Sequence, residues 1–230
     1  MTLLDRALSE EHYDVLDRAD DFVAETLAPR TDEIEASREF PRDVVEAAGD
    51  AGLLGILVPE AYGGLGGDFV SYCLALERVA AESAAVAETI QGHTFATLPV
   101  LNFGTDAQKD RLLPKMVSGE SVGAMLLTEP GAGSSPTELG TVAEATDDGY
   151  LLSGEKSFGT NAGVADVHLV VARKRPQPDD SHGVSVFLVP NPDDVEGFTF
   201  ERGEYLGMHG HVTGDSTFEA VEVDADALLG

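Results

Sequence analysis

The sequence predicts an α+β protein, with an N-terminal all-α domain at residues 1–120 and an all-β barrel or sandwich domain at residues 121–230. Apolar residues recur at helical spacing through the first half and in short strand-like runs through the second. Because the helices precede the strands instead of alternating with them, each type is expected to form its own domain. A chain of 230 residues with 43% apolar residues can bury a sizeable core.

The first helices are expected before a glycine-rich break at residues 63–67. An apolar stripe from Ser9 to Leu27 predicts one helix, which ends at Pro29. A short acidic helix is expected at residues 31–36. Another is expected to begin at Pro41, because proline is favoured as the first residue of a helix.

Three longer helical segments follow the break. One is expected at residues 68–81, and a second at residues 84–101 with an interruption near Gly92. The third, residues 106–117, is predicted as a pair of helices split by Pro114, since proline inside a helix removes a backbone hydrogen bond. The helical pattern ends there.

Short apolar runs predict the strands of the second half. They lie at residues 122–127, 141–145, 150–153, 167–172, 184–189 and 216–223. Asp148-Gly149 predicts a tight hairpin turn between the second and third of these strands. Residues 173–182 contain two prolines and several polar side chains, which indicates a surface loop.

The chain is strongly acidic. It carries 42 acidic and 14 basic residues, which give a net charge of −28. An acidic, lysine-poor, folded chain suggests a halophilic protein, because in roughly 1 M salt the Debye length is only ~3 Å and the repulsion is screened. The same charge argues against nucleic acid and anionic membranes as partners.

The sequence favours a cytoplasmic location. Asp5 follows Met1 closely, unlike the basic start of a secretory signal peptide. No run of about 18 apolar residues is present, so no membrane-spanning helix is expected. The single cysteine, Cys73, excludes an internal disulfide and is interpreted as a small core residue.

Two glycine-rich stretches carry the residues most suited to bind a ligand. In residues 123–134 an apolar strand ends at Thr128, and small residues follow that let a backbone approach a flat or charged group. In residues 154–163 Phe158 precedes Thr160 by two positions. A planar heteroaromatic ligand could stack on Phe158 while both threonines meet its polar edge. The alternative is a solvated loop with Phe158 in the core.

Other chemistry is disfavoured by spacing. The run from Gly131 lacks the third glycine of a dinucleotide fingerprint, which is Pro136 here, and no βαβ pattern surrounds it. His209 and His211 are two histidines in a glycine-rich loop without a cysteine nearby, which favours a turn over a metal site. No metal site is therefore predicted.

Five motifs, in order, resemble those of the acyl-CoA dehydrogenase family. LTEPGAGS at residues 127–134 resembles its first signature, and GEKSFGTN at residues 154–161 resembles its NGxKxWITN segment. The other motifs are VPEAYGGLGG at 58–67, FGTDAQKDRLLPKMVSG at 103–119, and LGMHG at 206–210 together with residues 218–230. The resemblance covers nearly all 230 residues.

The resemblance implies a flavoprotein enzyme of fatty acid metabolism. Members of the family have an N-terminal helical domain, a middle β-domain and a C-terminal helical bundle, and they bind FAD. They oxidise an acyl-CoA thioester to the 2,3-enoyl-CoA, with a glutamate removing the α-proton and the β-hydride going to the flavin. The electrons pass to an electron-transfer flavoprotein or a similar acceptor, and a homo-oligomer is expected.

The resemblance also implies which residues hold FAD. Leu127 and Thr128 would bond the pyrimidine edge of the flavin, and Thr160 would bond near N5. Phe158 takes the place of the usual tryptophan beside the ring, and Ser134 would lie near the flavin or the thioester end of the substrate. The residues carried over to the cofactor site are Met125, Leu127, Thr128, Ser134, Phe158, Gly159 and Thr160.

The sequence departs from the family pattern at several positions. Gly159 replaces a β-branched residue, and His209 replaces the arginine of GMRG. The chain ends at Gly230, where members enter the bundle that supplies the catalytic glutamate, so no catalytic residue is assigned. The helices expected at residues 68–81 and 84–101 would then expose apolar surface.

Three functions are compatible with these residues. The first is a FAD-dependent acyl-CoA dehydrogenase whose catalytic base comes from a missing C-terminal domain or a partner chain. The second is a non-catalytic flavin- or acyl-CoA-binding module. The third is a related flavin-dependent oxidase or monooxygenase on the same scaffold.

Overall fold

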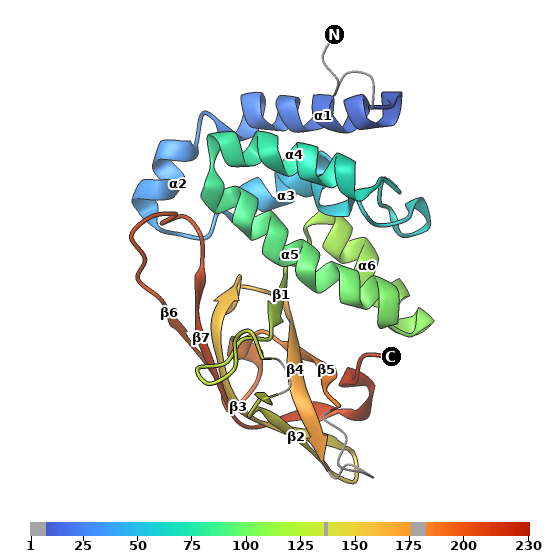
Figure 1. Ribbon diagram of the computed structural model, residues 1–230, viewed down its shortest axis with the longest axis vertical. Coiled ribbons are helices and arrows are strands. Elements are labelled where there is room, and N and C mark those ends of the chain that lie inside the picture. The colour runs from blue at the N-terminus through green and yellow to red at the C-terminus, as the bar shows by residue number, and fades with distance from the viewer. Residues whose placement is uncertain (1–7, 136–137, 176–182) are drawn as a thin grey trace.

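A layer of helices lies on one end of a curled mixed β-sheet (Figure 1). The computed structural model describes residues 8–135, 138–175 and 183–230. The helices, coloured blue to green, all precede the yellow-to-red strands, apart from the short green β1 at the junction. The predicted α+β class, with a helical region followed by a β region, is confirmed.

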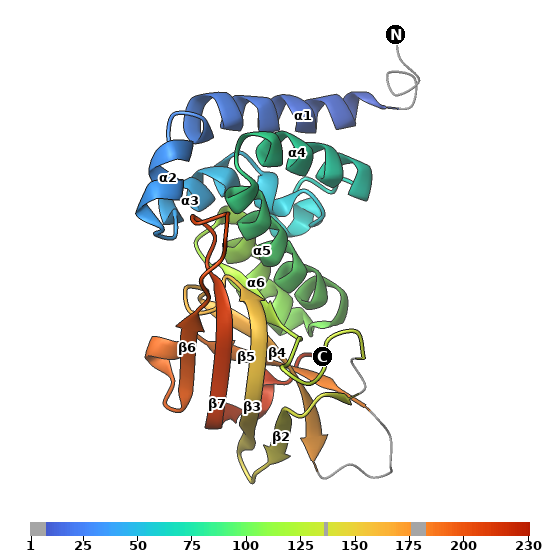
Figure 2. The same ribbon diagram turned by 60° about the vertical axis from the view of Figure 1, so that its left-hand side comes forward.

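The helices enclose an apolar core. Their bounds are α1 Glu10–Phe22, α2 Thr31–Ser37, α3 Arg42–Asp50, α4 Phe69–Glu82, α5 Ala84–Phe103 and α6 Asp106–Ser118. α1 continues into a turn of π-helix, Val23–Leu27, and lies along α4 (Figure 2). Ala19 and Phe22 of α1 belong to one buried cluster with Val79 of α4, so the predicted apolar stripe is part of the face that holds α1 on α4. α3 begins one residue later than expected, with Pro41 as its N-cap.

Both predicted helix interruptions are wrong. α5 runs unbroken through Gly92, where a Cβ atom would lie 2.2 Å from Cγ2 of Thr160 in the sheet. This glycine therefore permits close packing and does not end the helix. α6 likewise continues through Pro114, which is exposed, because Leu113 and Met116 beside it are fully buried and fix the helix on the core.

The described strands form one seven-stranded sheet. Their bounds are β1 Gly123–Leu126, β2 Val142–Ala145, β3 Gly149–Thr160, β4 Val167–Arg175, β5 Ser185–Pro190, β6 Phe198–Arg202 and β7 Thr213–Asp224. The order is β1-β4-β2-β3-β7-β6, with β5 also paired to β4. β4 pairs in parallel with β1 and with β2, and the other pairings are antiparallel. The predicted hairpin is confirmed, since Ala145 pairs with Tyr150 across it.

Two strands differ from the prediction. β3 runs beyond its predicted end at Ser153 and continues to Thr160. Register shifts after Leu152 and after Lys156 interrupt its pairing with β7, and such bulges hide a strand from a period-two pattern. β6 is not predicted at all, because it has only five residues and two of them are charged.

Part of the predicted surface loop at residues 173–182 belongs to the sheet. β4 continues to Arg175, and the remainder of that loop lies outside the described residues. Within the portions of the chain that the structure describes, the helices are too short or too polar to cross a membrane.

The outer faces of α4 and α5 carry exposed apolar side chains. Phe69 and Val70 are 62% and 49% exposed, and Phe95 and Phe103 are 55% and 69% exposed. The predicted apolar exposure of these two helices is therefore confirmed. Cys73 lies on the same exposed side of α4, so its interpretation as a core residue is wrong. The buried face of α4 is formed by Tyr72, Ala75 and Val79, and Cys73 lies outside that face.

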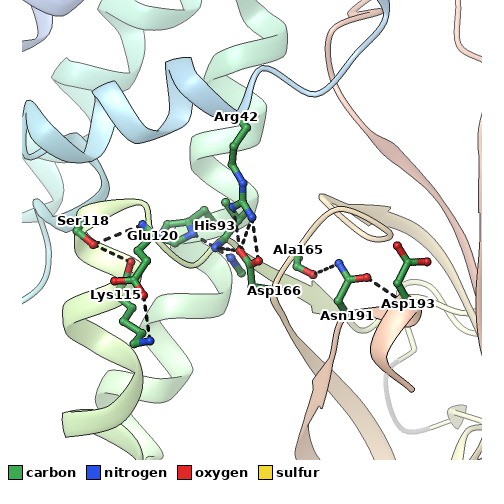
Figure 3. Close-up of polar contacts among 11 residues, drawn as sticks. Arg42, His93, Lys115, Ser118, Glu120, Ala165, Asp166, Asn191 and Asp193 are labelled. Carbon is green, nitrogen blue, oxygen red and sulfur yellow. Dashed lines mark hydrogen bonds and ion pairs between the residues drawn. The ribbon is translucent and has the colours of Figure 1, made fainter. Parts of the chain in front are cut away.

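Polar contacts fix the helices on the sheet (Figure 3). Arg42 on α3 donates two hydrogen bonds of 2.8 Å, one to each carboxylate oxygen of Asp166. Asp166 also accepts the N–H of Val122 at 2.7 Å, and Nδ1 of His93 on α5 accepts the N–H of Gly123 at 3.1 Å. Burial raises the pKa of Asp166, but the bonds from Arg42 and Val122 outweigh burial and hold that pKa below its ordinary value.

Candidate functional site

The structure brings the two glycine-rich stretches together at the ends of β1 and β3. The carbonyl of Thr128 accepts a hydrogen bond of 2.8 Å from the N–H of Ser157. A Cβ atom on Gly159 would lie 2.5 Å from Cδ2 of Leu126, so the end of β3 packs closely on the end of β1. Residues that are about 30 positions apart in sequence thus form one surface.

The predicted site residues differ in exposure. Phe158 is 66% exposed, so the alternative interpretation that places this ring in the core is wrong. Of the others, Leu127 and Ser134 are exposed, Gly159 is buried, and Met125, Thr128 and Thr160 are half-buried. Ser134 lies in the loop that follows β1, and no hydrogen bond within the described residues joins it to either strand.

Phe158 holds an unusual backbone conformation. Its φ is +59°, in the left-handed region that is strained for a bulky side chain. The register with β7 shifts between Lys156 and Gly159, and this bulge sets the ring outward. Such strain clusters at ligand sites, where the surrounding structure holds it in place.

Phe158 and Thr160 line an open groove of about 380 Å³. The other lining residues are Glu88, Tyr205, Gly207, Met208, His211 and Thr213. The groove therefore lies between α5, the end of β3 and the loop that leads into β7. It offers aromatic, hydroxyl, imidazole and carboxylate groups to a ligand.

His211 contributes a buried polar atom to this groove. The residue is 7% exposed, and its Nε2 has no hydrogen-bond partner in the described part of the chain. Burial lowers the pKa of His211 to about 4, and the nearby Arg202 adds to the shift, so the ring is neutral at pH 7. A ligand in the groove could supply the missing partner. His209 contacts the helices instead, since its N–H donates to Glu35 on α2 at 2.8 Å.

A buried ion pair that is absent from the sequence-based prediction lies behind Leu127. Nζ of Lys156 is 2.7 Å from Oε1 of Glu129 and 3.2 Å from the carbonyl of Leu127. The lysine and glutamate side chains are only 1% and 7% exposed. Lys156 is one of four lysines in the chain and stands inside the second motif, which is the signal that could have revealed it.

Three further donors hold the carboxylate of Glu129. They are the N–H of Gly140, the N–H of Thr141 at 3.0 Å and the hydroxyl of Thr141 at 2.5 Å. Burial raises the pKa of Glu129, but the bonds from Lys156 and Thr141 outweigh burial and hold that pKa below its ordinary value. Burial lowers the pKa of Lys156, and the carboxylate opposes this shift. The donors around Glu129 therefore favour its ionised form.

The fold is that of an α+β protein, with a helical layer followed by a curled mixed sheet. An exposed aromatic ring and hydroxyl groups lie beside the junction of helices and sheet, an arrangement that suits a planar ligand. Residues 9–120 match the model of the acyl-CoA dehydrogenase N-terminal domain, and residues 124–221 match that of the acyl-CoA dehydrogenase middle domain. The chain belongs to the acyl-CoA dehydrogenase family.

Individual relatives agree with this assignment. An acyl-CoA dehydrogenase of Bacillus subtilis (strain 168) is 40% identical over 212 residues, which cover 91% of this chain and 55% of that protein. The structure of an acyl-CoA dehydrogenase complexed with FAD, from Bacillus anthracis, matches with a TM-score of 0.88 and 32% identity, over 100% of this chain and 38% of that chain.

A further solved structure is described as an electron transferring flavoprotein of Acidaminococcus fermentans. It matches with a TM-score of 0.89 and 34% identity, over 97% of this chain and 58% of that chain. The present chain spans about half the length of the curated relatives it matches, between 51% and 60%.

Proposed function

We propose that this chain is the FAD-binding part of an acyl-CoA dehydrogenase, which oxidises an acyl-CoA thioester to the 2,3-enoyl-CoA. The observation that carries the proposal is Phe158, an exposed aromatic ring held at positive φ close to Thr160 and to the end of β1. Membership of the family, and relatives that carry the dehydrogenase activity in their names, support the type of reaction.

The residues around the groove fit a flavin. The unpartnered Nε2 of His211 offers a hydrogen bond to a polar ring edge. Nothing lies within 4 Å of a Cβ position at Gly131 or Gly133, so the backbone of that loop is open to a close-lying group. The residues proposed to hold FAD are Met125, Leu127, Thr128, Ser134, Phe158, Gly159 and Thr160. When bound, FAD supplies an acceptor for two electrons.

The protein's own residues bind and orient the reactants. Phe158 offers a flat apolar surface that excludes water from one face of a planar ligand. Thr128 and Thr160, both half-buried, offer hydroxyls that fix the direction of its polar edge. Ser134, in its exposed loop, is proposed to lie near the thioester end of the substrate.

The reaction also needs a base for the α-proton. No residue of this sequence matches the catalytic glutamate of the family, so we infer that the base comes from polypeptide outside these 230 residues. The exposed apolar faces of α4 and α5 support a covering domain or partner chain. The electrons would then leave to an electron-transfer flavoprotein or a similar acceptor.

Other features are proposed on the same basis. The change from helix to strand between Ser118 and Gly123 supports two domains that meet near residue 121. The net charge of −28 supports a halophilic, cytoplasmic protein, and screening by salt would also ease the binding of anionic acyl-CoA. We expect the far-UV circular dichroism of the chain to be lost on dialysis from about 1 M salt to low salt. Full stability in low salt would contradict halophilic adaptation.

The visible spectrum of the purified chain, in about 1 M salt, tests the main proposal. Bound flavin that bleaches when acyl-CoA is added would support a dehydrogenase with an unrecognised base. Bound flavin without bleaching is the expected result, because the proposed base lies outside these 230 residues, and it also fits the binding module. Hydrogen peroxide formed in air would favour the oxidase. An absence of bound flavin after incubation with FAD would contradict the proposal that this chain alone holds the cofactor.

A further inference from the structure

The peptide group between Leu127 and Thr128 is held from one side only. Its carbonyl accepts a hydrogen bond of 3.2 Å from the buried Nζ of Lys156. In a planar trans peptide the N–H points opposite to the carbonyl, so the N–H of Thr128 points away from Lys156. In residues 8–135, 138–175 and 183–230 that N–H has no hydrogen-bond acceptor. It is therefore a donor available to a ligand.

The next peptide group is fixed by the neighbouring residue of β3. The carbonyl of Thr128 accepts the N–H of Ser157 at 2.8 Å. Lys156 and Ser157 are consecutive and both buried, so two adjacent residues of β3 set the direction of two adjacent peptides at the end of β1. The half-buried Thr128 has little freedom left to rotate.

Lys156 is itself fixed by a closed set of partners. Oε1 of Glu129 accepts a hydrogen bond of 2.7 Å from Nζ of Lys156, and three donors from Gly140 and Thr141 hold the glutamate. Burying two charges costs several kcal/mol in desolvation, and apolar residues of similar volume often stabilise a core as well or better. A pair kept in this position is therefore better explained by the geometry it imposes than by the stability it adds.

We propose that Glu129 and Lys156 are positioning residues that hold the Leu127–Thr128 peptide with its N–H presented to the flavin ring. This inference rests on the proposed function, because it names what orients part of the proposed cofactor site. The lysine acts through the backbone and does not touch the ligand. Without it the peptide can turn, and the donor at Thr128 is no longer pre-oriented.

The test compares two neutralised pairs in the full 230-residue chain. The variant Glu129→Gln/Lys156→Met removes both charges and the donor to Leu127, while the single carboxamide oxygen of glutamine can still accept the two bonds from Thr141. The variant Glu120→Gln/Lys115→Met makes the same changes in an exposed pair on and just after α6, and serves as the matched control. If the first variant lacks a cooperative thermal transition, Glu129→Gln/Lys156→Gln replaces it, because two buried amides can bond to each other.

Two readouts are measured on each variant. In the ligand-free chain, the amide ¹H–¹⁵N signal of Thr128 should shift or split in the buried-pair variant and stay in place in the control. The dissociation constant of FAD should rise about tenfold in the buried-pair variant, as expected for one lost oriented hydrogen bond, and change less than about twofold in the control.

The outcomes separate the two proposals. A folded buried-pair variant with an unmoved Thr128 signal and unchanged FAD affinity would overturn the positioning role and leave a purely structural pair. If the unaltered chain binds no FAD, the proposed function of this chain fails. The Thr128 signal in the ligand-free variants then decides on the positioning role by itself.

Discussion

Lys156 and Phe158 lie two residues apart on β3, yet their environments are the reverse of what their side chains prefer. The lysine side chain is 1% exposed and Phe158 is 66% exposed. In a regular strand, residues at i and i+2 share one face, and a buried face selects the aromatic residue over the charged one. The bulge before Gly159 separates the two. Such a reversal of local preference lowers stability and is typical of functional sites, as proposed here for the end of β3.

Removing the buried charge of Lys156 should have the largest effect on stability. Lys156→Met leaves Glu129 buried without its partner, and we expect the free energy of unfolding to fall by about 3–5 kcal/mol. Urea unfolding in concentrated salt, followed by circular dichroism, measures the loss. Lys115→Met is the control, because its partner Glu120 is exposed and such pairs contribute about 0–1 kcal/mol. Equal losses in the two variants would contradict the importance of burial.

Lowering the pH should reveal the buried neutral histidines, because they affect stability at a higher pH than the buried carboxylate does. Burial lowers the pKa of His93 to about 4, below the unfolded value of 6.5. The unfolded chain therefore binds the extra proton first, so the stability present above pH 6.5 falls by up to about 3 kcal/mol as the pH drops to 4. The pKa values of His168 and His211 are also lowered to about 4, so these residues reduce stability over the same pH range. The lowered pKa of Glu129 affects stability only below about pH 4.5.

Urea unfolding between pH 7 and pH 4 measures this effect. We expect the fall in stability to begin near pH 6.5, well above the range in which the carboxylates titrate. His93→Gln should reduce the slope, because one of the three imidazoles is removed. A free energy of unfolding that stays constant from pH 7 to pH 5 would show that the buried histidines do not control acid stability.

Closing the space between α5 and β3 should have a smaller effect. In Gly92→Ala the new Cβ atom would lie 2.2 Å from Cγ2 of Thr160, so Thr160 must move. We expect a net loss of about 1–2 kcal/mol, after allowance for alanine's higher helix propensity, together with weaker FAD binding. Gly131→Ala is the control, since nothing lies within 4 Å of its Cβ position. If it destabilises as much as Gly92→Ala, close packing at Gly92 is not the cause.

Relieving the strain at Phe158 should change stability least and binding clearly. Phe158→Gly removes an unfavourable positive φ, so the free energy of unfolding should rise by no more than about 1 kcal/mol. The dissociation constant of FAD should increase about tenfold, because the stacking surface is lost. Phe103→Gly removes a ring that is equally exposed but lies outside the groove, and should leave FAD binding unchanged. A similar weakening in both variants would remove Phe158 from the site.

The sequence is informative where local pattern decides structure. Apolar periodicity is sufficient for the helices of the first half and for most strands, and Asp148-Gly149 is sufficient for the β2–β3 hairpin. It misleads where tertiary packing decides, as at Gly92, which looks like a helix break but is a contact point for Thr160. The Glu129–Lys156 pair joins residues 27 positions apart across two strand ends, so no local pattern reports it.

The bond between Arg42 and Asp166 has a consequence for how the chain is made. The two residues are 124 positions apart. At about 5–20 residues per second, a ribosome needs roughly 6–25 s to add Asp166 after Arg42. During that interval α3 lacks the carboxylate that anchors it, and the N–H of Val122, once synthesised, lacks its acceptor. The helical half of the nascent chain therefore lacks its ion pair with the β region until Asp166 has been synthesised.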